Sequence, residues 1–81
     1  NDYNDRNTVV AHLSLDHNER AMELLATMPK DAVTEYLRAI ACSRLGRKAE
    51  GREHFLEACR LDGRMEYRGN LDPEIAELLK Q

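Results

Sequence analysis

Residues 32–61 read AVTEYLRAIACSRLGRKAEGREHFLEACRL, and this stretch decides the fold. Apolar side chains recur in it at spacings of three and four on both sides of Gly46, which is the period of a helix that buries one face. Asp31, just before the stretch, is a favourable N-cap, and Gly46 is a favourable helix end. We therefore predict two helices, over residues 32–45 and 48–61, that fold back on each other as an antiparallel hairpin.

The N-terminal part of the chain predicts another, shorter hairpin over about residues 4–28. Two runs of apolar residues at helical spacing fill it, and Pro29 ends the second run. When the chain is aligned with itself so that Leu15-Asp16 falls on Leu45-Gly46, the match continues into the next helix without a gap. This alignment therefore predicts an internal repeat of two tandem hairpins.

The C-terminal part predicts one further helix, over about residues 72–80. Asp72 is a favourable N-cap, and Pro73 suits the first helical position, where its missing N–H is not needed. Between this helix and the preceding hairpin, residues 64–68 have room for one or two helical turns before Gly69-Asn70 breaks them.

The composition favours one small all-α domain. The chain has 81 residues, of which 42% are apolar and 33% charged, and this balance is typical of a globular protein rather than a disordered one. Two prolines and four glycines are too few for the frequent turns of a small all-β fold. The sequence contains no run of about 18 apolar residues, so it predicts no membrane span. The start shows no signal-peptide pattern, and the sequence is compatible with a cytoplasmic or a periplasmic location.

Small and large side chains follow a particular order along the hairpin at 32–61. Ala39, Gly51 and Ala58 allow helix backbones to approach closely, and Phe55 fills the space between successive hairpins. In this order the hairpin resembles a tetratricopeptide repeat, a helical pair of about 34 residues. The first hairpin has Val9, Ala21 and Leu25 at the corresponding places. The positions where the family usually has Trp, Leu, Tyr and Pro hold Glu35, Arg38, Cys42 and Gly63.

The resemblance covers about residues 4–63 and implies a fold. Residues 1–81 would form one tetratricopeptide-like domain, with tandem hairpins stacked in a right-handed superhelix, an α–α solenoid, and the helix at 72–80 as a C-terminal cap. About three repeats are normally needed to bury a continuous core. We therefore expect either a fragment of a longer repeat protein or a chain that associates with itself through the N-terminal hairpin.

The resemblance also implies a function, which is binding of a protein partner without catalysis. In this family the first helix of each hairpin lines a concave groove for an extended peptide or a partner helix. Tyr36 and Ile40 would be apolar anchors there, and Arg6 and Arg44 would pair with acidic groups of the partner. The alternative is that Tyr36 and Ile40 only pack against the neighbouring hairpin. The predicted groove residues are Arg6, Val10 and Leu13 from the first hairpin, and Tyr36, Ile40, Ser43 and Arg44 from the next.

The sequence predicts no enzyme, no metal ion and no cofactor. His12 and His17 stand five apart, whereas helical metal pairs usually stand three or four apart. His54 lies near Cys59 in sequence, so that a Cys/His nucleophilic pair is conceivable. No Asn or Asp that would orient His54 is evident, and small structural thiols at Cys42 and Cys59 are favoured instead.

The charge distribution leaves two other functions as alternatives. The formal charge of −3 disfavours a broadly basic binder of nucleic acid. Residues 38–68 nevertheless carry eight basic and five acidic groups, so an Arg-rich binder of nucleic acid or of an anionic surface is the weaker alternative. We expect a mixed, solvated helix face there, which includes Glu50, Glu53 and Glu57, and no nucleic-acid partner. The other alternative is a structural cap of a larger solenoid, without a ligand of its own.

Overall fold

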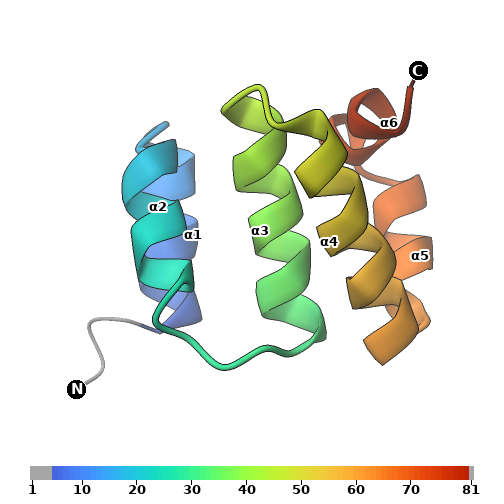
Figure 1. The fold of residues 1–81 in the computed structure, drawn as a ribbon, viewed down its shortest axis with the longest axis horizontal. Helices are drawn as coiled ribbons and strands as arrows, with labels where there is room; N and C mark the ends of the chain where they lie inside the picture. The colour runs from blue at the N-terminus through green and yellow to red at the C-terminus, as the bar shows by residue number, and fades with distance from the viewer. Residues whose placement is uncertain (1–4, 81) are drawn as a thin grey trace.

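The computed structural model of the protein describes residues 5–80, and this part of the chain consists of six α-helices without a strand (Figure 1). The predicted all-α class is thereby confirmed. Residues 1–4 and residue 81, which the prediction of a single domain included, lie outside the described residues. The helices are α1 (Arg6–Ser14), α2 (Asn18–Leu25), α3 (Ala32–Arg44), α4 (Lys48–Leu61), α5 (Arg64–Asn70) and α6 (Pro73–Leu79).

The molecule measures 36 × 24 × 19 Å along its principal axes. The helices follow one another along the longest of these axes. The helices α1 and α2 lie at one end, α3 and α4 in the middle, and α5 and α6 at the other end (Figure 1). The central helix α3 contacts each of the other five. Packing on α3 therefore connects the N-terminal and C-terminal helices.

The turn after α1 and the turn after α3 have the same backbone structure. Asp16 and Gly46 each adopt a positive φ, of 62° and 80°. One residue further on, the N–H of His17 donates to the carbonyl of His12, and the N–H of Arg47 donates to the carbonyl of Cys42, at 2.8 Å in both turns. Such a hydrogen bond is typical of the Schellman motif, in which the residue after the C-cap adopts a left-handed conformation and ends the helix. The internal repeat read from the sequence thus corresponds to two equivalent turns.

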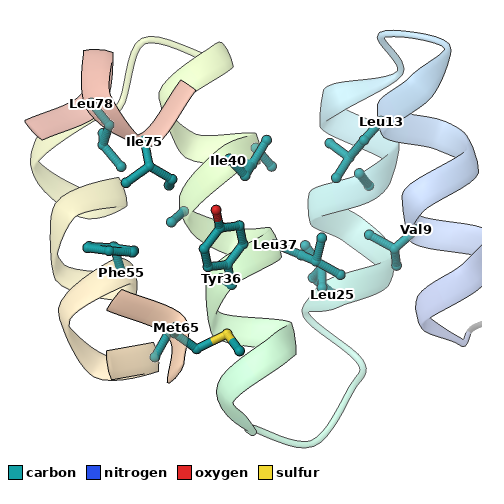
Figure 2. Close-up of a cluster of buried hydrophobic side chains, with 14 of the residues drawn as sticks. Val9, Leu13, Leu25, Tyr36, Leu37, Ile40, Phe55, Met65, Ile75 and Leu78 are labelled. Atoms are coloured by element: carbon teal, nitrogen blue, oxygen red, sulfur yellow. The ribbon is translucent and has the colours of Figure 1, made fainter. Parts of the chain in front are cut away.

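One hydrophobic core runs through all six helices (Figure 2). Almost every residue of α3 from position 34 to position 42 is buried in it. Because each helix contributes at least one buried apolar side chain, the described chain forms a continuous core by itself. The larger members are Val9 and Leu13 from α1, Leu24 and Leu25 from α2, Tyr36, Leu37 and Ile40 from α3, Phe55 from α4, Met65 from α5, and Ile75 and Leu78 from α6.

The predicted turns before Gly69-Asn70 form α5, which ends at Asn70, and Gly69 is in addition a packing residue within the last turn. The helix α5 continues through both residues, and Leu71 is its C-cap. A Cβ atom on Gly69 would lie 2.5 Å from Cζ of Phe55, closer than packed atoms come, and at a tight 3.2 Å from Cγ2 of Ile75. Glycine therefore lets α5 approach α4 and α6 more closely than any other residue would.

Asp31 begins α3 as predicted, through a reciprocal capping arrangement. The N–H of Thr34 donates to the Asp31 carboxylate at 2.8 Å, and the N–H of Asp31 donates to the Thr34 hydroxyl at 2.9 Å. The bond from the Thr34 amide lowers the pKa of Asp31 below its ordinary value. The stability that this carboxylate contributes is therefore present above the ordinary pKa of an aspartate, and is lost as the pH falls through the lowered pKa of the folded state.

We expect Asp31→Ala to lower the free energy of unfolding by about 0.5–2 kcal/mol near neutral pH. The loss should shrink as the pH falls from about 7 towards 2, because the wild-type carboxylate is then protonated too. Urea denaturation followed by circular dichroism across this range measures both effects. Glu53→Gln removes an exposed acid from within α4 that caps no helix and is the control. A loss that is independent of pH for Asp31→Ala would contradict the prediction.

Candidate functional site

Tyr36, the main predicted groove anchor, is buried beneath the C-terminal helices with an exposed fraction of 1%. Its hydroxyl donates to Oδ2 of Asp72 at 2.7 Å, and the Arg68 guanidinium lies 4.5 Å from the centre of its ring. The ring of Phe55 meets it edge to face, with centroids 6.0 Å apart. These contacts agree with the alternative for Tyr36, which is packing against neighbouring helices. The Tyr36 side chain is therefore not open to a partner.

Arg44, the predicted groove cation, connects three parts of the chain. Its guanidinium donates to both carboxylate oxygens of Glu74 at 2.8 Å, and to the carbonyl of Leu13 at 2.6 Å. It also lies 3.5 Å from Asp16. The hydrogen bonds to Glu74 raise the pKa of Arg44 further. Its bonding capacity therefore serves to hold the ends of α1 and α3 to the start of α6.

The other predicted groove residues are divided between the core and the surface. Leu13 and Ile40 are buried in the core. Val10 is 46% exposed on α1, and Nη1 of Arg6 lies 3.8 Å from the Asp31 carboxylate. Ser43 is partly buried. The seven residues do not share one open surface in this chain.

An open groove lies elsewhere, between the start of α2 and the turn from α3 to α4, and we call it the α2 groove. It consists of two adjoining hollows of about 440 and 230 Å³ that share Glu19 and Leu45. Sequence reasoning did not find it, because helical periodicity does not predict which turn comes to lie beside which helix. Asp16, His17, Asn18 and Arg20 complete the lining of the larger hollow, and Met22, Glu23 and Arg47 complete that of the smaller one.

The α2 groove combines an apolar floor with charged groups. Leu45 and Met22 are both partly buried, and each leaves part of its side chain open to solvent. Arg20 pairs with Glu23 at 2.9 Å. Glu19 forms no ion pair with any residue from 5 to 80, so its carboxylate is open to a cation from outside. Arg47 also forms no ion pair with any residue from 5 to 80, but it lines only the smaller hollow, whereas Glu19 lines both. The groove therefore suits a ligand with one large apolar group and a positive charge that lies toward the larger hollow.

A buried polar network lies between α3 and α4. The Glu35 side chain is only 5% exposed and accepts a hydrogen bond from Arg38. Arg38 also donates to the carbonyls of Leu25 and Met28, at 2.5 and 3.1 Å, which joins α3 to the end of α2. On the other side, Nδ1 of His54 lies 2.7 Å from Oε1 of Glu35. Glu35 therefore orients His54. The sequence alone did not indicate this, because only Asn or Asp was expected in that role.

At least one of the two cysteines lies near His54. Cys42 lies close to it, since potential ligand atoms of Cys42, Glu50 and His54 lie within 4.8 Å of one another. Cys42 is fully buried, and burial raises the pKa of its thiol, to which the nearby Glu50 carboxylate adds. Burial also raises the pKa of Cys59. A thiol whose pKa is raised is mostly protonated near neutral pH and is then a poor nucleophile, so neither environment favours a catalytic cysteine.

The basic residues of the segment 38–68 are interleaved with acids, as expected for a mixed face. Arg64 pairs with Asp62 at 2.7 Å, and Arg60 pairs with Glu57 at 2.5 Å. Hydrogen bonds from Arg60, which has the larger effect, and from Lys30 lower the pKa of Glu57 to about 2. These pairs reduce the positive potential that would attract a polyanion.

None of the described helices is long and apolar enough to cross a membrane. Comparison of the chain with protein-family models, with curated proteins and with solved structures gave no match. The resemblance to tetratricopeptide repeats therefore stays a prediction.

Proposed function

We propose that the protein is a non-enzymatic interaction module that binds an extended peptide segment of a partner protein in the α2 groove. This proposal rests on the two residues that line both hollows: Leu45, with an apolar side chain, and Glu19, whose carboxylate forms no ion pair with any residue from 5 to 80. An extended peptide places neighbouring side chains a few ångströms apart, which suits two adjoining hollows.

We propose further that the helical pairs form a short tetratricopeptide-like array. The equivalent turns at Asp16 and Gly46 support this proposal, as do the buried small residues. Ala39 and Ala58 have no exposed surface, and a Cβ on Gly51 would lie 3.1 Å from the Ala39 carbonyl oxygen. In such an array the α2 groove lies beside the second helix of the first pair, and not on the surface formed by the first helices of each pair.

The chemistry of the groove specifies the peptide. A large apolar side chain would contact Leu45 and Met22, and a Lys or Arg next to it would pair with Glu19. An apolar anchor in a partly enclosed hollow supplies most of the free energy of such contacts, while an exposed ion pair mainly adds selectivity. We therefore expect selected peptides to share an apolar residue flanked by a basic one.

Selection of random peptides displayed on phage against the 81-residue chain tests this proposal. Binding of the selected peptides is then measured by fluorescence anisotropy. Leu45→Asp is expected to weaken binding about tenfold or more, as for loss of a central contact. Glu19→Lys, an exposed change that leaves the core untouched, should reverse the preference for basic peptides. Leu56→Asp, at a leucine that is 63% exposed on α4, is the matched control and should change neither property.

The outcomes separate the proposal from its alternatives. Peptides that bind all three variants equally would show that the α2 groove is not the site. A failure to select any peptide would favour the structural cap. Salt-dependent binding of short DNA or RNA, weakened by loss of arginines in 38–68, would favour the Arg-rich alternative.

A further inference from the structure

A group of potential metal ligands lies on the facing sides of α3 and α4, and it shares no residue with the α2 groove. Ligand atoms of Cys42, Glu50 and His54 all lie within 4.8 Å of one another. Thiolate, imidazole and carboxylate are the three side-chain ligands that zinc accepts. One comes from α3 and two from α4, so an ion there would join the two central helices.

The backbone brings these three residues together for specific reasons. Glu50 and His54 are four residues apart on α4 and so lie on one face of that helix. Between them, a Cβ on Gly51 would lie only 3.4 Å from Cβ of Cys42, so the missing side chain of Gly51 allows the two helices to approach closely there. The proximity of the ligands is therefore a consequence of tight helix packing.

The surroundings of His54 are those of a metal-binding histidine. Glu35 is held by Arg38 as an ionised partner, and an ionised carboxylate can only accept a hydrogen bond. In the 2.7 Å contact Nδ1–H of a neutral His54 would donate to Glu35, and Nε2 is then the nitrogen that a metal ion would use. A carboxylate behind a ligating imidazole fixes its orientation and raises its basicity.

We propose that Cys42, Glu50 and His54 bind a zinc ion, with Glu35 as the group that orients His54. Water occupies the fourth position of the tetrahedron, as in zinc sites with three protein ligands. Binding replaces the thiol proton of Cys42 by Zn²⁺, and that proton is released to solvent.

The required movement of the ligands is small. With Zn–S of about 2.3 Å and Zn–N and Zn–O of about 2.0–2.2 Å, neighbouring ligand atoms in a tetrahedron lie about 3.3–3.6 Å apart. The present separations of up to 4.8 Å must therefore close by about an ångström. Glu50 is exposed, and the side chain of His54 is 30% exposed, so both have room to change rotamer while the buried Cys42 stays in place.

Titration of the 81-residue chain with Co²⁺ under reducing conditions tests the proposal by absorption spectroscopy. The expected result is a thiolate-to-cobalt charge-transfer band that one equivalent of Zn²⁺ removes. His12 and His17, whose Nδ1 atoms are 3.4 Å apart, are another potential site for Co²⁺. A pair of imidazoles produces no thiolate band, so the spectrum distinguishes the two sites.

Matched variants identify the ligands. Cys42→Ser should abolish the charge-transfer band, while Cys59→Ser should keep it. Glu50→Gln should weaken Co²⁺ binding about tenfold or more, and Glu53→Gln, an exposed change on the same helix, should not. Glu35→Gln should weaken it about 10–100-fold through the orientation of His54.

Three results would overturn the proposal. These are the lack of a thiolate band in the wild-type chain, a band that survives Cys42→Ser, and a band lost in Cys59→Ser. Circular dichroism of each variant shows whether it is folded. If the buried change at Cys42 prevents folding, the comparison of Glu50→Gln with Glu53→Gln decides by itself, and equal affinities would reject the site.

Discussion

Replacing Tyr36 with Ala is expected to lower the free energy of unfolding by about 3–5 kcal/mol, the cost of removing a buried aromatic ring. The change removes the edge-to-face contact with Phe55, the cation–π contact with Arg68 and the hydrogen bond to Asp72 together. A chain of this length is typically stable by only about 4–12 kcal/mol. A large share of the molecules should therefore be unfolded at moderate temperature, and α5 and α6 should lose their attachment to α3.

Chemical denaturation followed by circular dichroism measures this loss. Tyr67→Ala is the matched control, because Tyr67 is 71% exposed on α5 and its removal should change stability little. Tyr36→Phe keeps the ring and removes only the hydroxyl that donates to Asp72, which should cost about 1.5–3 kcal/mol. Equal losses for Tyr36→Ala and Tyr67→Ala would mean that Tyr36 is not the buried anchor of the C-terminal helices.

Replacing Glu35 with Ala is expected to cost about 3–5 kcal/mol, as for breaking a buried ion pair on one side only. The change leaves Arg38 without its carboxylate partner and His54 without its orienting group. Arg38 keeps its hydrogen bonds to the carbonyls of Leu25 and Met28, so its charge stays in place at the junction of α2 and α3. The remaining buried charge is the physical cause of the loss.

A double-mutant cycle tests this explanation under metal-free conditions. Glu35→Ala combined with Arg38→Ala should cost less than the sum of the two single changes, with a coupling energy of about 0.5–3 kcal/mol. Glu53→Ala removes an exposed carboxylate from α4 and should have little effect. Additive losses at Glu35 and Arg38 would show that the two side chains do not depend on each other.

Much of the helical structure could be predicted because its signals are local. Asp31 and Asp72 were identified as N-caps from their side chains, and Gly46 as a helix end from its freedom to adopt a positive φ. The alignment of Asp16 with Gly46 in the sequence corresponds to two equivalent turns. Such signals act within one or two helical turns, so they can be read without knowledge of distant residues.

The environments of the candidate site residues could not be predicted in the same way. The spacing of Tyr36 placed it on a helix face, but whether that face is open depends on α5 and α6, which follow only after the whole of α4. Gly69 carries the local signal of a helix break, yet the close approach of Phe55 makes glycine the residue that fits inside α5. In both cases packing between distant segments outweighs local preference.

The sequence by itself determined the all-α class, the helix starts at capping residues and the repeated turns, because these depend on backbone hydrogen bonds between near neighbours. Only the tertiary structure decided that Tyr36 is buried and that Leu45 and Glu19 border one groove. It likewise brought His54 to Glu35, 19 residues away, and close to Cys42. These placements depend on how closely α3 approaches its neighbours, and that distance is the joint result of many side-chain contacts rather than of any one stretch of sequence.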